Sequence, residues 1–131
     1  MTDGYPPNFS PGEFNCKCGE HCDGPSPHAA KTRHLAWTLQ QIRNEIGFPI
    51  RINSAYRCKQ HNANVGGASK SKHLEGIAAD LDVVGVPPKQ VADVVAKLME
   101  TGAIPNGGLG RYNTFTHIDI REAPARWGSN G

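Results

Sequence analysis

One ten-residue segment, residues 71–80, constrains this chain more than any other; it reads Ser-Lys-His-Leu-Glu-Gly-Ile-Ala-Ala-Asp. The segment places His73 and Asp80 seven positions apart, and a strand-like run follows. A later segment, Phe-Thr-His-Ile-Asp-Ile-Arg, alternates strictly and puts His117 and Asp119 on one face of a predicted strand. Two imidazoles and a carboxylate are the ligand types of a catalytic zinc site, which needs three protein ligands and one open position. The two segments together predict a zinc site.

Length and composition predict one small domain. A chain of 131 residues can bury a hydrophobic core large enough to fold without disulfides or bound metal ions. Its 15 Gly and 10 Pro predict short elements joined by many turns. The net charge is only +2, and no run of five Lys or Arg occurs, so nothing suggests nucleic acid. No apolar run approaches the length of a membrane span. We expect a single zinc-binding domain over residues 1–131, monomeric and without nucleic-acid or membrane partners.

The N-terminus lacks the basic and apolar regions of a secretory signal peptide. Either the sequence is that of a mature form, or the protein is made in the cytoplasm and leaves the cell by another route. We expect the second case, with synthesis in the cytoplasm and no signal peptide.

Four cysteines form an uneven pattern. Cys16, Cys18 and Cys22 fall within seven residues, and Cys58 stands apart. An even number is compatible with two disulfides, and the tight spacing is equally compatible with a structural zinc site that recruits Cys58. A chain without an export signal favours reduced thiols. The sequence indicates a structural role of one kind or the other and leaves the choice open.

Hydrophobic periodicity predicts two helices. The first follows an N-cap and helix-starting proline at Ser26-Pro27, repeats apolar residues at helical spacing, and ends at Gly47. The second opens at Pro87-Pro88 and ends at Gly102. Residues 1–25, rich in Pro, Gly and Cys, are expected to be irregular.

Alternating segments predict the strands. Strands are expected at residues 50–56 and 77–84, and a hairpin over residues 110–120. A long loop is expected between Arg57 and Ser71, and a polar, Gly-rich tail from Glu122. Helices and strands do not alternate regularly, so the class is α+β, with a small antiparallel sheet and helices packed on one side.

The site pattern resembles a known family. The motif SxHxxGxAxD is matched at every fixed position, by Ser71, His73, Gly76, Ala78 and Asp80. It is the signature of the zinc D,D-peptidases of the M15 type, which share a fold with the hedgehog signalling domain. The upstream Ser-Ala-Tyr-Arg resembles the family's Ser-Gly-Tyr-Arg, with Ala in place of Gly, and the predicted hairpin resembles the family's C-terminal hairpin. The likeness extends over residues 26–127, most of the chain.

The resemblance implies zinc ligands at His73 and Asp80, and His117 as the natural third ligand, because neutral imidazole is the commonest metal-binding side chain. Asp119, on the same strand face, would then act as general base or orient the attacking water. An overlay on relatives with His-x-His gives the reverse assignment, with Asp119 on zinc and His117 as base. Strand periodicity does not decide between the two.

The resemblance also assigns residues that contact the substrate. Arg57 matches the family arginine that reaches the active site, where a fixed guanidinium stabilises developing negative charge or binds a substrate carboxylate. Ser71 is expected to support the loop or contact substrate, and His61 and Tyr56 to line the cleft. Glu75 occupies a position that the family leaves free, so we expect it to face solvent.

The resulting prediction is a zinc metallopeptidase that hydrolyses a peptide bond in peptidoglycan stem peptides or cross-links. The family includes D,D-carboxypeptidases, D,D-endopeptidases and L-alanyl-D-glutamate endopeptidases, and a compact phage endolysin acting on the host wall fits the lack of a signal peptide. The cofactor is one catalytic Zn²⁺, with a second, structural Zn²⁺ at the cysteines as an open question. The alternative is a non-catalytic zinc-binding module that serves as a structural component or, like the hedgehog domain, acts through protein partners.

Overall fold

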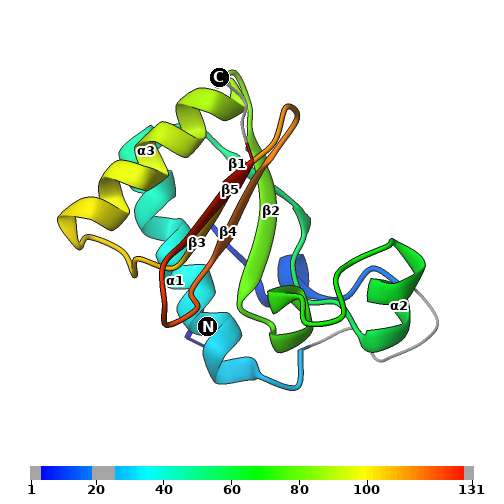
Figure 1. The fold of residues 1–131 in the computed structure, drawn as a ribbon. Coiled ribbons are helices and arrows are strands. Elements are labelled where there is room, and N and C mark those ends of the chain that lie inside the picture. The colour runs from blue at the N-terminus through cyan, green and yellow to red at the C-terminus, as the bar shows by residue number, and fades with distance from the viewer. Residues whose placement is uncertain (1–3, 19–25, 129–131) are drawn as a thin grey trace.

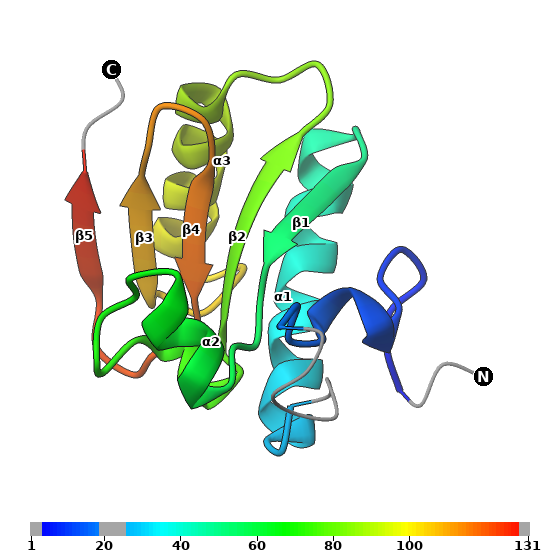
Figure 2. The same ribbon diagram turned by 90° about the vertical axis from the view of Figure 1, so that its right-hand side faces the viewer.

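The computed structural model describes residues 4–18 and 26–128. It contains one five-stranded sheet with the strand order β1-β2-β4-β3-β5 (Figures 1 and 2). The strands are β1 (Ile50–Ser54), β2 (Ala78–Val83), β3 (Gly108–Arg111), β4 (Thr116–Asp119) and β5 (Ala125–Gly128). The first four pair antiparallel, but β5 runs parallel to β3. The α+β class is therefore confirmed, and the expectation of a purely antiparallel sheet is corrected to a mixed one.

Two long helices cover one face of the sheet, as predicted. Figure 1 shows α1 (Ala29–Ile46) and α3 (Pro88–Thr101) on one side, and the short α2 (Lys59–Asn64) on the other. Single turns of 3₁₀ helix occur at Pro11–Phe14 and Lys72–Glu75. None of the helices in the described ranges is long and apolar enough to cross a bilayer.

A glycine ends each of the two long helices. Gly47 and Gly102 close α1 and α3 with φ of 79° and 82°, a left-handed conformation that glycine adopts without steric cost, so both predicted ends are confirmed. The predicted start of α1 is corrected. Helix begins at Ala29, because the Ser26 hydroxyl accepts a bond from the backbone N–H of His28, two residues on, and holds a turn there instead of capping the helix.

Two elements lie where the sequence predicted none. α2 interrupts the predicted loop 57–71, and its first residue follows Cys58, whose sulfur accepts a bond from the N–H of His61. β5 lies within the predicted polar tail, where Ala125 and Trp127 are partly buried. Its pairing with β3 connects residues distant in sequence, so local periodicity gave no signal for it.

The pairing of β2 with β4 decides which side chains face the core. Ala79 lies opposite Ile118, and both are fully buried beneath the helices. Neighbouring residues point to the other face, so Asp80 and His117, which are also paired, project away from α1 and α3. The predicted division of residues 77–84 into an apolar and an acidic face is confirmed within β2.

The N-terminal segment belongs to the core. Phe9 and Phe14 are only 2% and 1% exposed. The Phe14 ring meets those of Tyr5 and Phe9 edge-on at 5.7 and 6.2 Å. The segment is irregular apart from one 3₁₀ turn, as predicted, but its aromatic side chains complete the apolar cluster beneath the sheet.

Truncating Phe14 should therefore destabilise the whole domain. Removing a fully buried aromatic ring costs about 3–5 kcal/mol, whereas a substitution at the surface usually costs no more than about 0.5 kcal/mol. We expect Phe14→Ala to lower the free energy of unfolding by the larger amount, and the matched control Phe48→Ala, at a side chain 51% exposed, by the smaller. Urea unfolding measures both, and equal losses would contradict the placement of the N-terminal segment in the core.

Candidate functional site

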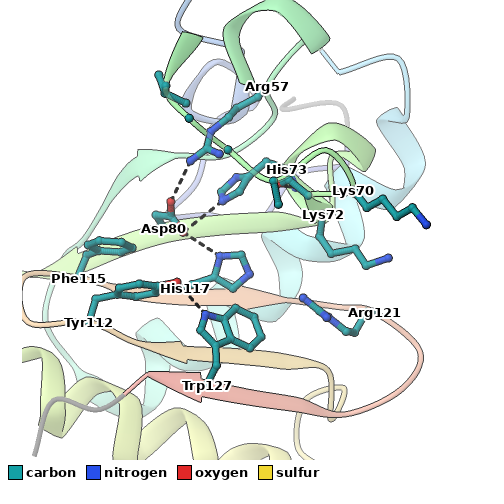
Figure 3. Close-up of a pocket in the computed structure, with 15 residues that line it drawn as sticks. Arg57, Lys70, Lys72, His73, Asp80, Tyr112, Phe115, His117, Arg121 and Trp127 are labelled. Atoms are coloured by element: carbon teal, nitrogen blue, oxygen red, sulfur yellow. Dashed lines mark hydrogen bonds and ion pairs between the residues drawn. The ribbon is translucent and has the colours of Figure 1, made fainter. Parts of the chain in front are cut away.

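Three predicted ligands converge on one point above the open face of the sheet. One ligand atom each from His73, Asp80 and His117 lies within 4.8 Å of the others. His73 Nε2 lies 3.2 Å, and His117 Nδ1 2.9 Å, from the same oxygen of Asp80 (Figure 3). Two imidazoles and a carboxylate around one point form a donor set that suits a divalent zinc ion. The residues present therefore fit the metal that the sequence predicts.

His73 is held by hydrogen bonds at both its backbone and its ring. Its backbone N–H donates to the hydroxyl of Ser71, the N-cap of the 3₁₀ turn, at 3.2 Å. Its ring Nδ1 lies 2.6 Å from the carbonyl oxygen of Ala55, which can only accept, so Nδ1 carries the proton. The lone pair is therefore on Nε2, the nitrogen that faces Asp80. This arrangement fixes a metal-binding tautomer before any metal is present.

Gly76, the glycine of the motif, allows the 3₁₀ turn that carries His73 to pack against α1. Gly76 has φ 71°, and a Cβ there would come within 2.4 Å of the Ser26 hydroxyl and 2.6 Å of the Thr32 hydroxyl. The Thr32 hydroxyl donates to the carbonyl oxygen of Gly76 at 2.8 Å. Any side chain at position 76 would push this turn away from α1. The glycine therefore lets the turn that carries His73 pack closely against the helix.

His117 is held from behind by Asp119. Its Nε2 lies 2.9 Å from Asp119 Oδ2, so a proton on Nε2 is shared with that carboxylate, and Nδ1 is left facing Asp80. Asp119 is fully buried and also accepts bonds from Gly108 N–H at 3.0 Å and from two nitrogens of the Arg121 guanidinium at 2.8 and 2.6 Å. Burial alone would raise the pKa of Asp119, but these bonds hold it well below its usual range. The carboxylate thus stays ionised.

This geometry bears on the two assignments that the sequence left open. His117 contributes a ligand atom to the convergent group, and Asp119 does not. The His117 ring stands between Asp119 and the metal position, and both carboxylate oxygens already accept hydrogen bonds. We propose on this basis that His117 is the third ligand and that Asp119 orients it. The general-base role of Asp119 and the reverse assignment stay predictions.

Arg57 reaches the same group from the other side. Its guanidinium lies 3.3 Å from Asp80 Oδ2 and donates to the side chains of Ser54 at 3.1 Å and Asn62 at 3.2 Å. A Cβ at Gly67 would overlap the Asn62 amide oxygen, at 2.1 Å, so this glycine makes room for the residue that orients Arg57. The predicted arginine is thus fixed in place beside the ligands.

These groups open into a cavity of about 700 Å³. Its basic lining residues Lys70, Lys72 and Arg121 lie on one side of the ligand cluster in Figure 3, and the aromatic rings of Tyr112 and Phe115 on the other. The two rings stack with centroids 4.4 Å apart. The cavity therefore offers one cationic and one apolar wall to a bound molecule.

Trp127 forms the base of the aromatic wall. Its ring centroid lies 5.0 Å from that of His117, its indole N–H donates to the Tyr112 hydroxyl at 2.7 Å, and the Arg121 guanidinium lies 5.1 Å from its ring. Gly110 leaves room for this ring, because a Cβ there would come within 2.5 Å of the indole nitrogen. Sequence reasoning missed Arg121 and the full role of Trp127. The signal for Arg121 was its place two residues after Asp119 on an alternating segment.

The remaining predicted residues divide into two groups. Ser71 lines the cavity, whereas His61 and Tyr56 are not among its lining residues. Backbone N–H groups of these two donate to Cys58 Sγ and to the Phe14 carbonyl, so both hold neighbouring segments together. Glu75, expected in solvent, has a side chain 43% exposed that pairs with Lys72. 

Comparison with known proteins agrees with the motif. The family model described as Peptidase M15 matches residues 7–119. The chain belongs to the peptidase M15 family. It is 42% identical over 84 residues to the zinc D-Ala-D-Ala carboxypeptidase of Streptomyces albus G, an alignment that covers 60% of this chain and 32% of that protein. The chain thus spans about a third of the length of this relative. The resemblance inferred from the sequence is confirmed at the level of the family.

Zinc retention should separate the roles of His117 and Asp119 in this M15 family member. We expect His117→Ala to lose high-affinity zinc binding, because it removes a donor. Asp119→Asn should weaken zinc binding by about 10–100-fold, the usual effect of a residue that orients a ligand. Competition with a chromophoric chelator measures both affinities. If Asp119→Asn released the metal and His117→Ala kept it at full affinity, the reverse assignment would hold.

Zinc affinity should also depend on pH through His117. Burial alone would lower the pKa of His117, but its bonds to Asp119 and Asp80 raise it above the ordinary value. A metal binds the neutral ring, so below this raised pKa zinc must displace a proton, and the apparent affinity should fall by about tenfold per pH unit as pH decreases. Chelator competition between about pH 5 and 8 tests this. Affinity that stayed constant over that range would contradict it.

Proposed function

We propose that this M15 peptidase uses one zinc ion, held by His73, Asp80 and His117, to hydrolyse a peptide bond in peptidoglycan. The observation that carries the proposal is the convergence of His73 Nε2 and His117 Nδ1 on one oxygen of Asp80. A backbone carbonyl positions the ring of His73 through Nδ1, and a buried carboxylate positions that of His117 through Nε2, so that the other nitrogen of each ring faces Asp80. Such outer partners are typical of built metal sites.

The bound ion supplies the reactive centre, since zinc with an open position lowers the pKa of its water to about 7 and polarises a carbonyl. The protein's own residues hold and orient the reactants. Asp119 keeps His117 in the productive ring orientation through Nε2. The stacked rings of Tyr112 and Phe115 offer an apolar surface to the substrate on one side of the cavity.

Arg57 is the residue placed to bind negative charge. Its side chain is only 14% exposed and is fixed by Ser54 and Asn62, so it enters the reaction with little loss of conformational freedom. A fixed guanidinium next to the ligands can bind a substrate carboxylate or stabilise the oxyanion that develops at the scissile carbonyl. In either role the guanidinium holds an anionic group of the substrate close to Asp80. This would place the scissile bond over the ligand cluster.

The charge of the cavity supports an acidic peptide as substrate. Arg57, Lys70, Lys72 and Arg121 line it, and Asp80 is the one carboxylate among its described lining residues. Peptidoglycan stem peptides carry free carboxylates along the chain and at the C-terminus, and these complement a cationic wall. The relative from Streptomyces albus G is named for D-Ala-D-Ala, a substrate that ends in a carboxylate.

The place of action follows from this substrate. We propose that the protein acts on the cell wall, and that it serves as a lysis enzyme of the phage endolysin type. Membership of the peptidase M15 family and the relative named as a zinc D-Ala-D-Ala carboxypeptidase support the place of action, and the lysis role stays a prediction. The rival function is a zinc-binding module that recognises a partner without hydrolysis, and only an assay with substrate separates the two.

Digestion of purified sacculi tests the function. We expect the zinc-loaded protein to release peptide fragments, chelation to stop the release, and added zinc to restore it. Removing the His73 ligand by His73→Ala should reduce cleavage at least about 100-fold. His34→Ala, which changes an exposed histidine of α1, should cleave normally. Mass spectrometry of the new termini identifies the bond. Full zinc occupancy without any cleavage would favour the non-catalytic module.

A further inference from the structure

A second cluster of metal-ligand side chains lies outside the cavity. Cys16, Cys18 and Cys58 place their sulfur atoms within 4.8 Å of one another. Tetrahedral zinc with bonds of about 2.3 Å holds sulfur atoms about 3.8 Å apart, so small side-chain adjustments would suffice to bind an ion. Cys16 and Cys58 are each only 8% exposed, and these two are free thiols in the structure. Cys22, the fourth cysteine of the sequence, lies outside the described residues.

Backbone amides already point at two of these sulfurs. The N–H of Cys58 donates to Cys16 Sγ at 3.3 Å, and the N–H of His61 donates to Cys58 Sγ at 3.4 Å. A thiolate is the form of cysteine that binds metals, and N–H donors directed at sulfur stabilise its negative charge. Burial raises the pKa of the Cys16 thiol, and the N–H donor of Cys58 offsets part of that rise.

From these contacts we propose that Cys16, Cys18 and Cys58 bind a structural zinc ion, separate from the ion of the cavity. Soft thiolates select zinc over the hard cations of the cell. Structural zinc takes four ligands, and these thiolates supply three of them. This site depends only on the cysteine geometry and stands whether or not the protein hydrolyses peptidoglycan.

The ion would link the N-terminal segment, through Cys16 and Cys18, to Cys58 beside the cavity. The two segments already lie side by side, because the N–H of Tyr56 donates to the Phe14 carbonyl at 3.2 Å. Cys58 directly follows Arg57 and is the N-cap of α2, the helix that carries Asn62. A metal at Cys58 would therefore restrain both Arg57 and the residue that orients it. The proposed role is to position the cavity wall, without contact with the substrate.

A disulfide is the competing arrangement. Cys16 and Cys58 come from segments 42 residues apart and meet at an amide-to-sulfur hydrogen bond, and both are free thiols. A shared metal ion accounts for all three sulfurs at once.

Cobalt substitution in the His73→Ala protein tests the proposal without reference to activity. Cobalt bound to thiolates gives an intense charge-transfer absorption in the near ultraviolet, which cobalt held by nitrogen and oxygen lacks. We expect about one tightly held metal ion per chain in this background, with the thiolate band. Cys16→Ser should abolish the band, and so should Cys58→Ser, which keeps an acceptor for the N–H of His61.

If the serine variants fail to fold, the spectrum of the His73→Ala chain with all cysteines intact still decides the question. Metal without the thiolate band, or no retained metal, would overturn the proposal. Alkylation followed by mass mapping under non-reducing conditions provides the second readout, and a Cys16–Cys58 disulfide in the purified protein would also overturn it. Loss of wall hydrolysis with the thiolate band intact would affect only the catalytic proposal.

Discussion

The backbone pairing of β2 with β4 places Asp80 opposite His117, and the rest of the site depends on this register. A shift of β4 by one residue would turn His117 into the core and bring Ile118 to the open face beside Asp80. The core prevents this, because Ala79 and Ile118 are fully buried beneath α1 and α3. The packing that stabilises the fold therefore also holds two of the three ligands together.

The third ligand reaches the sheet by a different route. His73 lies on a 3₁₀ turn that is tied to α1 through Gly76 and to the residue after β1 through Ala55. Each histidine ligand is thus held by a hydrogen bond on the side away from Asp80. These bonds keep polar groups in a fixed arrangement in a partly buried place, where unpaired polar groups would destabilise the fold. Arg57 and Arg121 balance the carboxylates Asp80 and Asp119, so the site is held in place before any ion binds.

Much of this could be predicted from sequence, because the informative signals were local. Gly47 and Gly102 marked helix ends, and the alternation around Asp80 and His117 separated a core face from a ligand face. Features that depend on distant contacts were not visible. β5 forms only through pairing with β3, and α2 is too short for a periodic signal. The burial of Asp119 against Arg121 was likewise not visible in the local sequence pattern.

The central claim is that His73, Asp80 and His117 hold one divalent ion in common. Anomalous diffraction at the zinc absorption edge, from crystals of the zinc-loaded protein, tests it most directly because it locates the ion without assuming its ligands. Our account predicts a peak between these three side chains, with His73 bound through Nε2 and His117 through Nδ1. Ordered density that shows the three side chains turned apart, with no zinc peak among them, would contradict it.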